Sequence, residues 1–223
     1  AVSSGKCPEP LHVHVPMLGA RWNDTLAVID NQTTCKAMSP LVLIHGYAGS
    51  TETWLPQIQY FMQQRRVMAP DIRGHGKSSA PYTMYTMPEL VTDLRHIVEY
   101  QKIRRPFVLV GHSFGGAICA EYAAQFPADV ERLILIATPA AFPLTMPSMI
   151  AGHIPSALYQ IWWRFRTRWN APVHVMKRML HNNMKKWRGD AVLSQLQMPA
   201  LLINGVQDSY FPAEVFARVY EIL

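Results

Sequence analysis

The sequence predicts an α/β fold, in which a mostly parallel sheet is covered by helices on both faces. Short, nearly continuous apolar runs alternate with amphipathic stretches of helix length, as expected where strands are buried on both sides. The chain has 223 residues, 49% of them apolar and 16% charged, which is enough for one sizeable core. These proportions exclude a disordered chain, and 12 Gly with 17 Pro exclude a collagen-like one.

A hairpin is predicted at the start of the chain. The runs Leu11–Val15 and Leu26–Asn31 pair antiparallel when the numbers of opposite residues sum to about 41–42. This register brings Cys7 close to Cys35, just beyond the strand ends, where either a disulfide or two free thiols would fit. Cys119 lies in a predicted helix and is expected to be a small buried residue. The cysteine spacing matches no zinc or redox motif, so no metal site is expected.

The parallel sheet is predicted from five apolar runs, each bounded by Gly, Pro or Asp. They are Leu41–His45, Val67–Pro70, Phe107–Val110, Leu133–Ala137 and Ala200–Ile203. Helical spacing of apolar residues between these runs predicts helices at Thr53–Gln64, Met87–Gln101 and Phe114–Gln125.

After Pro139 the alternation stops. Residues 139–198 replace the expected single crossover helix and are predicted to form a helical cap, so that residues 1–138 and 199–223 make the core. A run of 31 residues without Lys, Arg, Asp or Glu lies between Arg132 and Arg164 and extends into this segment. Four prolines interrupt this run, so a membrane-spanning helix is not expected.

The most specific motif is a G-x-S-x-G sequence from Gly111 to Gly115. It follows the apolar run Phe107–Val110 directly and opens a helix, which is the context of a nucleophile elbow. Such a turn holds the serine in a strained conformation that lifts its hydroxyl above the sheet edge, and the flanking glycines let the backbone pass. Ser113 is therefore the candidate nucleophile.

Two further segments are expected to surround Ser113. The turn after Leu41–His45 would bring the backbone N–H of Tyr47 beside that of Phe114, giving two donors for an oxyanion. His45 is expected to be structural and to bond to backbone groups. Residues 71–78 follow the next strand and are expected to form a tight loop that shapes the pocket.

Together these motifs resemble the capped group of the α/β-hydrolase superfamily, which includes esterases, carbon–carbon bond hydrolases, cofactor-free haloperoxidases and epoxide hydrolases. The resemblance runs from Leu41 to Asp208. It implies that Asp208 is the acid that orients a catalytic histidine, and it implies neither cofactor nor metal. The serine at position 113 separates the chain from epoxide hydrolases and haloalkane dehalogenases, which use an aspartate.

One departure concerns the base. The family order is Ser, Asp, His, whereas no histidine follows His181, and the residues after Asp208 are too few for the last strand and helix of the usual sheet. Losing the base lowers turnover by about 10⁶. The base could come from a cap histidine (His153, His174 or His181) or from a segment or chain that pairs with the sheet edge at Ala200–Ile203. Alternatively, the protein is not catalytic.

Positive charge is concentrated in the predicted cap. The net charge is +6, and residues 140–189 hold eight Lys and Arg without an acidic residue. Mixed aromatic and cationic side chains suit an anionic membrane surface, although they would equally suit an acyl pocket with solvated cations around it. No motif for nucleic-acid binding accompanies them. The mixture is densest at Trp162, Trp163, Arg164, Arg166, Arg168 and Trp169.

From these features we expect a serine hydrolase that acts on a carboxylic ester, or a related acyl-type bond, of a small apolar substrate. The alternative is a catalytically silent hydrolase-fold protein that serves as a binding or membrane-associated assembly subunit. The two differ in whether Ser113 reacts.

Overall fold

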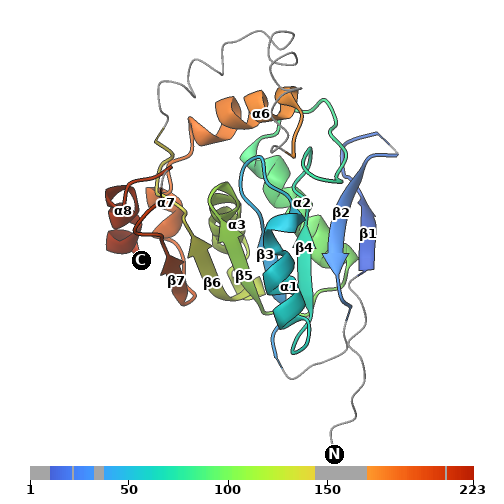
Figure 1. Ribbon diagram of the computed structural model, residues 1–223, viewed down its shortest axis with the longest axis horizontal. Helices are drawn as coiled ribbons and strands as arrows, with labels where there is room; N and C mark the ends of the chain where they lie inside the picture. The colour runs from blue at the N-terminus through green and yellow to red at the C-terminus, as the bar shows by residue number, and fades with distance from the viewer. Residues whose placement is uncertain (1–10, 22, 33–37, 144–169, 209) are drawn as a thin grey trace, which may run out of the picture.

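A seven-stranded sheet with helices on both faces organises the protein (Figure 1). The computed structural model describes residues 11–21, 23–32, 38–143, 170–208 and 210–223. The strand order is β1-β2-β4-β3-β5-β6-β7. The strands are β1 (Leu11–Pro16), β2 (Thr25–Asp30), β3 (Leu41–Ile44), β4 (Val67–Pro70), β5 (Phe107–His112), β6 (Val130–Ile136) and β7 (Ala200–Ile203).

The predicted hairpin is confirmed, because Leu11 lies opposite Asp30 and Val15 opposite Leu26. Strand β2 also pairs antiparallel with β4, and every other neighbouring pair is parallel. Cys7 and Cys35 lie outside the described residues. Cys119 is buried, as predicted, and burial raises the pKa of its thiol.

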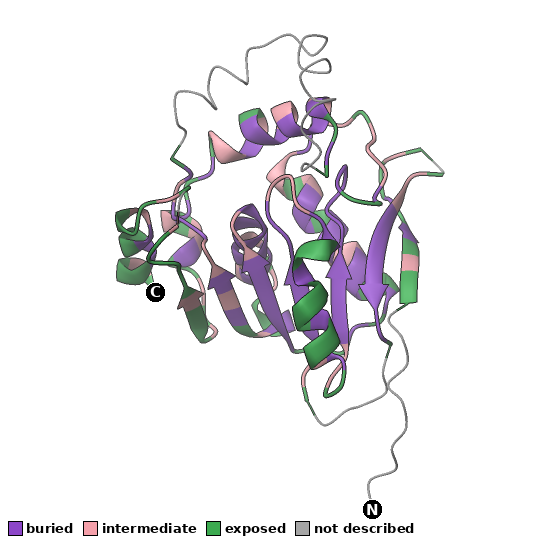
Figure 2. Ribbon diagram, viewed as in Figure 1, coloured by how far each residue is buried: buried purple, intermediate pink, exposed green. Residues whose placement is uncertain are grey.

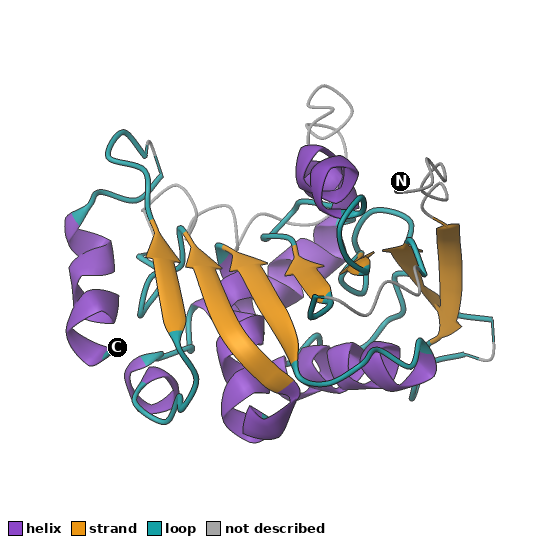
Figure 3. Cartoon of the chain, turned by 90° about the horizontal axis from the view of Figure 1, so that it is seen from below, coloured by secondary structure: helices purple, strands orange, loops and turns teal. Residues whose placement is uncertain are grey.

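Two apolar cores lie on opposite faces of the sheet (Figure 2). The larger one packs α2 (Met87–Tyr100) and α3 (Phe114–Gln125) against the strands, and the smaller one packs η1 (Thr51–Trp54) and α1 (Leu55–Phe61) against β3, β4 and β5. Figure 3 shows the helices on either side of the strands. Two short helices lead into strands: η2 (Pro127–Asp129) directly precedes β6, and α7 (Asp190–Leu193) precedes β7.

Local chemistry explains where two helices begin. The predicted helix at Thr53–Gln64 opens with the 3₁₀ turn η1, because the Ser50 side chain accepts a hydrogen bond from the amide of Glu52 and caps it there. Helix α2 starts at a capping box, in which the Glu89 carboxylate accepts from the Thr86 amide at 2.7 Å.

Strand β7 and helix α8 (Glu214–Ile222) differ from the expectations. We expected β7 to be covered on both faces, yet Leu201 is 53% and Ile203 is 44% exposed. The expectation is wrong because α1 covers β3, β4 and β5 but does not reach β7 (Figure 2). The sequence analysis also missed α8, which buries Phe216 and Val219, one helical turn apart.

Above the carboxyl ends of the parallel strands lies α6 (Val173–Met179), which continues into the π-helical turn η3 (Leu180–Met184) (Figure 1). The carbonyl of Met176 accepts a hydrogen bond from the Tyr47 hydroxyl at 2.8 Å, so α6 is tied to the turn after β3. Both elements belong to the predicted cap, whose residues 144–169, including the aromatic and cationic cluster from Trp162 to Trp169, lie outside the described residues. Within the described ranges, no helix has the length and hydropathy to cross a membrane.

Candidate active site

Ser113 occupies a sharp turn between β5 and α3. Its backbone angles are φ 52° and ψ −119°, a conformation that strains any residue other than glycine. Three hydrogen bonds hold the turn: the Ser113 amide donates to the Ile136 carbonyl at 2.8 Å, and the Ser113 carbonyl accepts from the Gly116 amide at 2.9 Å and the Thr138 hydroxyl at 3.2 Å. Surrounding structure therefore imposes the strain.

Both glycines of the motif are required by close approach of backbone. A Cβ atom added to Gly111 would lie 2.4 Å from the Cα atom of Gly116. A Cβ atom added to Gly115 would lie 2.3 Å from the carbonyl oxygen of His45, which belongs to the turn after β3. A side chain at either position would push the elbow out of shape.

The turn after β3 lies against the elbow. A Cβ atom on Gly46 would be 3.3 Å from the Cβ atom of Ser113, so the chain at Gly46 and Tyr47 passes beside the serine. Phe114 is the first residue of α3, and its amide therefore has no acceptor within the helix. The structure thus brings together Ser113, Phe114 and the chain around Tyr47.

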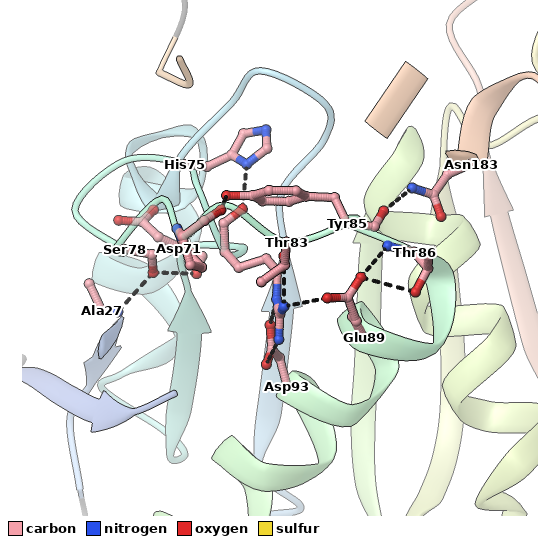
Figure 4. A network of polar contacts seen from close by, with 12 residues as sticks. Ala27, Asp71, His75, Ser78, Thr83, Tyr85, Thr86, Glu89, Asp93 and Asn183 are labelled. Atoms are coloured by element: carbon pink, nitrogen blue, oxygen red, sulfur yellow. Dashed lines mark hydrogen bonds and ion pairs between the residues drawn. The ribbon is translucent and has the colours of Figure 1, made fainter. Parts of the chain in front are cut away.

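The loop after β4 is held rigid by the carboxylate of Asp71, which is buried. It accepts hydrogen bonds from the amide of Thr51 at 2.7 Å, the hydroxyl of Thr51 at 2.5 Å and the amide of Lys77 at 2.8 Å. Ser78 joins this loop to β2, because its hydroxyl donates to the Asp71 carbonyl and accepts from the Ala27 amide (Figure 4). Asp71 therefore fixes the loop shape.

His45 and His75 are buried and neutral. The amide of Ile72 donates to His45 Nε2 at 3.0 Å, and the amide of Ala48 donates to His75 Nε2 at 3.2 Å, so the proton of each ring lies on Nδ1, facing a backbone carbonyl. Burial lowers the pKa of His45 and lowers that of His75 to about 3. His45 is structural, as predicted.

Asp208 lies on the turn after β7. Its Oδ1 atom accepts from the amides of Tyr210 at 2.8 Å and Phe211 at 3.0 Å. Burial lowers the pKa of His112, and the charge of Asp208 opposes that effect, so the two side chains are electrostatically coupled. The sequence analysis gave His112 no role, and only the pairing of β5, β6 and β7 brings it near Asp208.

Aromatic side chains surround these groups. The ring of His112 packs edge-on against Trp54, with the ring centres 6.4 Å apart. The buried ring of Phe142 lies 5.8 Å from Phe114 and 6.3 Å from Phe211. Phe142 thus connects the residue after Ser113 with the segment after Asp208 through aromatic contacts.

No histidine among the described residues hydrogen-bonds to the Ser113 hydroxyl. His174 packs on Tyr82 and Tyr85, at ring distances of 5.8 and 6.5 Å, and His181 is exposed. His153 lies outside the described residues. Asp190 pairs with Arg218 at 2.6 Å as a surface carboxylate.

In the described ranges, no group of three or more His, Cys, Asp or Glu residues is placed to hold a metal ion.

Comparison with known proteins identifies the family. The family described as alpha/beta hydrolase fold matches residues 39–171, which include the elbow and the loops around it. The chain belongs to this family. "Protein ABHD8" from Homo sapiens is 32% identical to this hydrolase-fold chain over 226 residues, covering 86% of the chain and 50% of that protein. The chain therefore spans about half the length of the curated relatives it matches.

Solved structures share the hydrolase fold at low sequence identity. An enol-lactonase from Burkholderia xenovorans LB400 has a TM-score of 0.78 and 18% identity, covering 94% of this chain and 87% of that one. An esterase from Exiguobacterium antarcticum has a TM-score of 0.73 and 19% identity, covering 96% and 88%. These matches establish the fold alone.

Proposed function

We propose that the protein is a serine hydrolase that cleaves a carboxylic ester, or a related acyl-type bond, with Ser113 as its nucleophile. The observation that carries the proposal is the left-handed backbone of Ser113 at a turn from strand to helix. Glycine occupies positions 111 and 115 of this turn, where a side chain would collide with neighbouring backbone. Strain of this kind persists where a function requires it. Membership of a hydrolase family supports the same reaction class.

In the proposed reaction, Ser113 Oγ attacks the acyl carbon and loses its proton to a general base. The negative charge that forms on the carbonyl oxygen is stabilised by the amides of Tyr47 and Phe114 and by the amino end of α3. The bond to the leaving group then breaks, the base returns the proton to that group, and water hydrolyses the acyl-enzyme. The reaction requires no cofactor.

The general base of this proposal is a histidine oriented by Asp208 and carried by a segment that pairs with the free edge of β7. The amide of Leu133 donates to the carbonyl of Pro199, just before β7, and the amide of Ala137 donates to that of Ile203, so the carbonyls of Pro199 and Ile203 face β6. By the alternation of a strand, the backbone groups of Leu202 point away from β6 and are available for pairing. Asp208 follows this strand directly.

An apolar substrate fits the surroundings of Ser113. Phe142 bridges Phe114 and Phe211, so aromatic rings pack beside the residue that follows Ser113 and the segment that follows Asp208.

Labelling with a fluorophosphonate tests the proposal, because this probe reacts with activated serines. We expect the full-length protein to be labelled and Ser113→Ala to be unlabelled, while Ser194→Ala, which changes an exposed serine elsewhere, keeps full labelling. A folded protein that resists labelling would favour the alternative, a catalytically silent binding subunit.

A further inference from the structure

The outer face of α6 and η3 is cationic. Residues 170–189 contain no acidic residue, and the apolar side chains of Val175 and Met179 face the core. Among the described residues, Arg178, Lys185, Lys186 and Arg188 form no ion pair, in contrast to Arg73 or Arg95, which pair with carboxylates. Lys177 and Arg178 lie on α6, and Lys185, Lys186 and Arg188 follow η3 directly, with Lys186 and Arg188 exposed.

Two large side chains are displayed beside this face. Tyr82 is 82% exposed and Met84 is 59% exposed, although both lie on a loop that is firmly held. Arg178 donates to the Thr83 carbonyl at 2.5 Å, with its guanidinium 3.5 Å above the Tyr82 ring, and Asn182 donates to the Met84 carbonyl at 2.6 Å. The loop is therefore fixed to the helix while its apolar groups remain in water.

Cations beside exposed apolar side chains suit a lipid surface better than an acidic protein or a nucleic acid. An acidic protein or a nucleic acid would use the cations and would gain less from an isolated tyrosine and methionine. The boundary of a lipid bilayer takes both, because anionic headgroups attract cations while aromatic and apolar side chains insert between lipids.

We propose that the outer face of α6 and η3, together with the cations of residues 185–188 that follow η3 and the Tyr82–Met84 loop, docks on an anionic lipid surface. The partner is a bilayer rich in acidic phospholipid, and the proposal goes beyond the hydrolase reaction, which does not need it. The face lies over the carboxyl ends of the strands, at the same end of the sheet as Ser113 (Figure 1). A docked protein would hold its serine close to lipid-dissolved esters.

Vesicle sedimentation tests the proposal. We expect the full-length protein to bind phosphatidylcholine vesicles that contain phosphatidylserine, and to bind them more weakly as the salt concentration rises. We expect no binding to vesicles of pure phosphatidylcholine. Each cation near such a surface contributes about fivefold, so replacing Lys185, Lys186 and Arg188 together with alanine should weaken binding roughly 100-fold. Tyr82→Ser should weaken it about tenfold without changing the salt dependence.

Matched controls remove the same groups elsewhere. Lys102, Arg104 and Arg132 lie near the amino ends of β5 and β6, and replacing all three with alanine should leave vesicle binding unchanged. Tyr60→Ser changes a tyrosine that is 63% exposed on α1. No binding at low salt, equal losses in the control variants, or selective binding of an acidic protein or nucleic acid in place of vesicles would each overturn the proposal.

Discussion

At the scale of single residues, the elbow depends on the absence of two side chains. The carbonyl oxygens of Ile44 and His45 lie 2.5 and 2.3 Å from where a Cβ atom of Gly115 would stand. Carbonyl groups at the end of a central strand cannot move aside without breaking the sheet. The geometry of Ser113 is thus coupled to β3 as well as to its own strand.

We therefore expect Gly115→Ala to lower the free energy of unfolding by about 1–3 kcal/mol and to abolish labelling of Ser113, because overpacking shifts the backbone. Urea denaturation and fluorophosphonate labelling measure the two effects. Gly205→Ala is the control, since apart from the adjoining residues the nearest atom to its added methyl group would be the amide nitrogen of Asp208, at 3.9 Å. Normal labelling of Gly115→Ala would contradict this account of the elbow.

The two buried histidines make stability depend on pH. The pKa of folded His75 is about 3, below the ordinary value of 6.5, so the unfolded chain binds more protons between these values. The free energy of unfolding then falls as pH falls below 6.5, by about 1.4 kcal/mol per pH unit for each such histidine. Above pH 6.5 this contribution is constant.

His75→Gln removes one of these titrations. We expect its unfolding free energy to fall less steeply than that of the wild type between pH 6 and pH 4, by about 1.4 kcal/mol per pH unit. Denaturant melts at several pH values would show the difference, and identical slopes would mean that His75 is not buried in its neutral form.

At the scale of elements, the loop after β4 is attached to α2 by a buried ion pair. Arg73 donates to both carboxylate oxygens of Asp93, at 2.5 and 2.6 Å, and to Glu89 at 3.0 Å (Figure 4). Glu89 also caps α2 through Thr86, so one carboxylate fixes both the start of the helix and the loop. Asp93 is only 4% exposed, although the helical spacing alone assigns charged residues to the outer face.

We expect Asp93→Ala to lower the free energy of unfolding by about 3–5 kcal/mol, because it leaves Arg73 buried with a weaker partner. Glu99→Ala is the matched control: its carboxylate lies on the same helix and pairs with Arg95 at 2.6 Å, but the side chain is 51% exposed. An exposed pair contributes up to about 1 kcal/mol. Equal losses in the two variants would contradict the role assigned to burial.

At the scale of the whole molecule, the sheet has an uncovered end. Leu201 and Ile203 face water on the side where α1 covers the central strands, and the backbone of Leu202 points outward. Exposed apolar edges invite pairing with another strand. The proposed base-carrying segment would occupy this edge and bring a histidine to Asp208.

Leu202→Pro tests this edge. Proline removes an amide that does not bond to β6, so the sheet should persist while pairing outside β7 is lost. Leu202→Ala is the control, since it removes the branched end of the leucine side chain but keeps the amide. We expect ester hydrolysis by the full-length protein to survive in Leu202→Ala and to fall at least about 100-fold in Leu202→Pro, and equal activities would contradict edge pairing.

The predictions from sequence succeed where local signals are strong. The α3 helix is confirmed at Phe114–Gln125, and the hairpin register follows from apolar alternation. The position of Ser113 follows from glycine spacing alone. Helix α8 was missed because Glu214–Ile222 spans only nine residues, which is too short a window to establish a helical period.

By itself the sequence determined the strand order along the chain, the glycine positions and the serine between them, because sterics and periodicity act over a few neighbouring residues. Only the tertiary structure decided which of these groups meet. It coupled His112 to Asp208, buried Asp93 beside Arg73 and left β7 uncovered, since such contacts depend on how distant strands and helices pack.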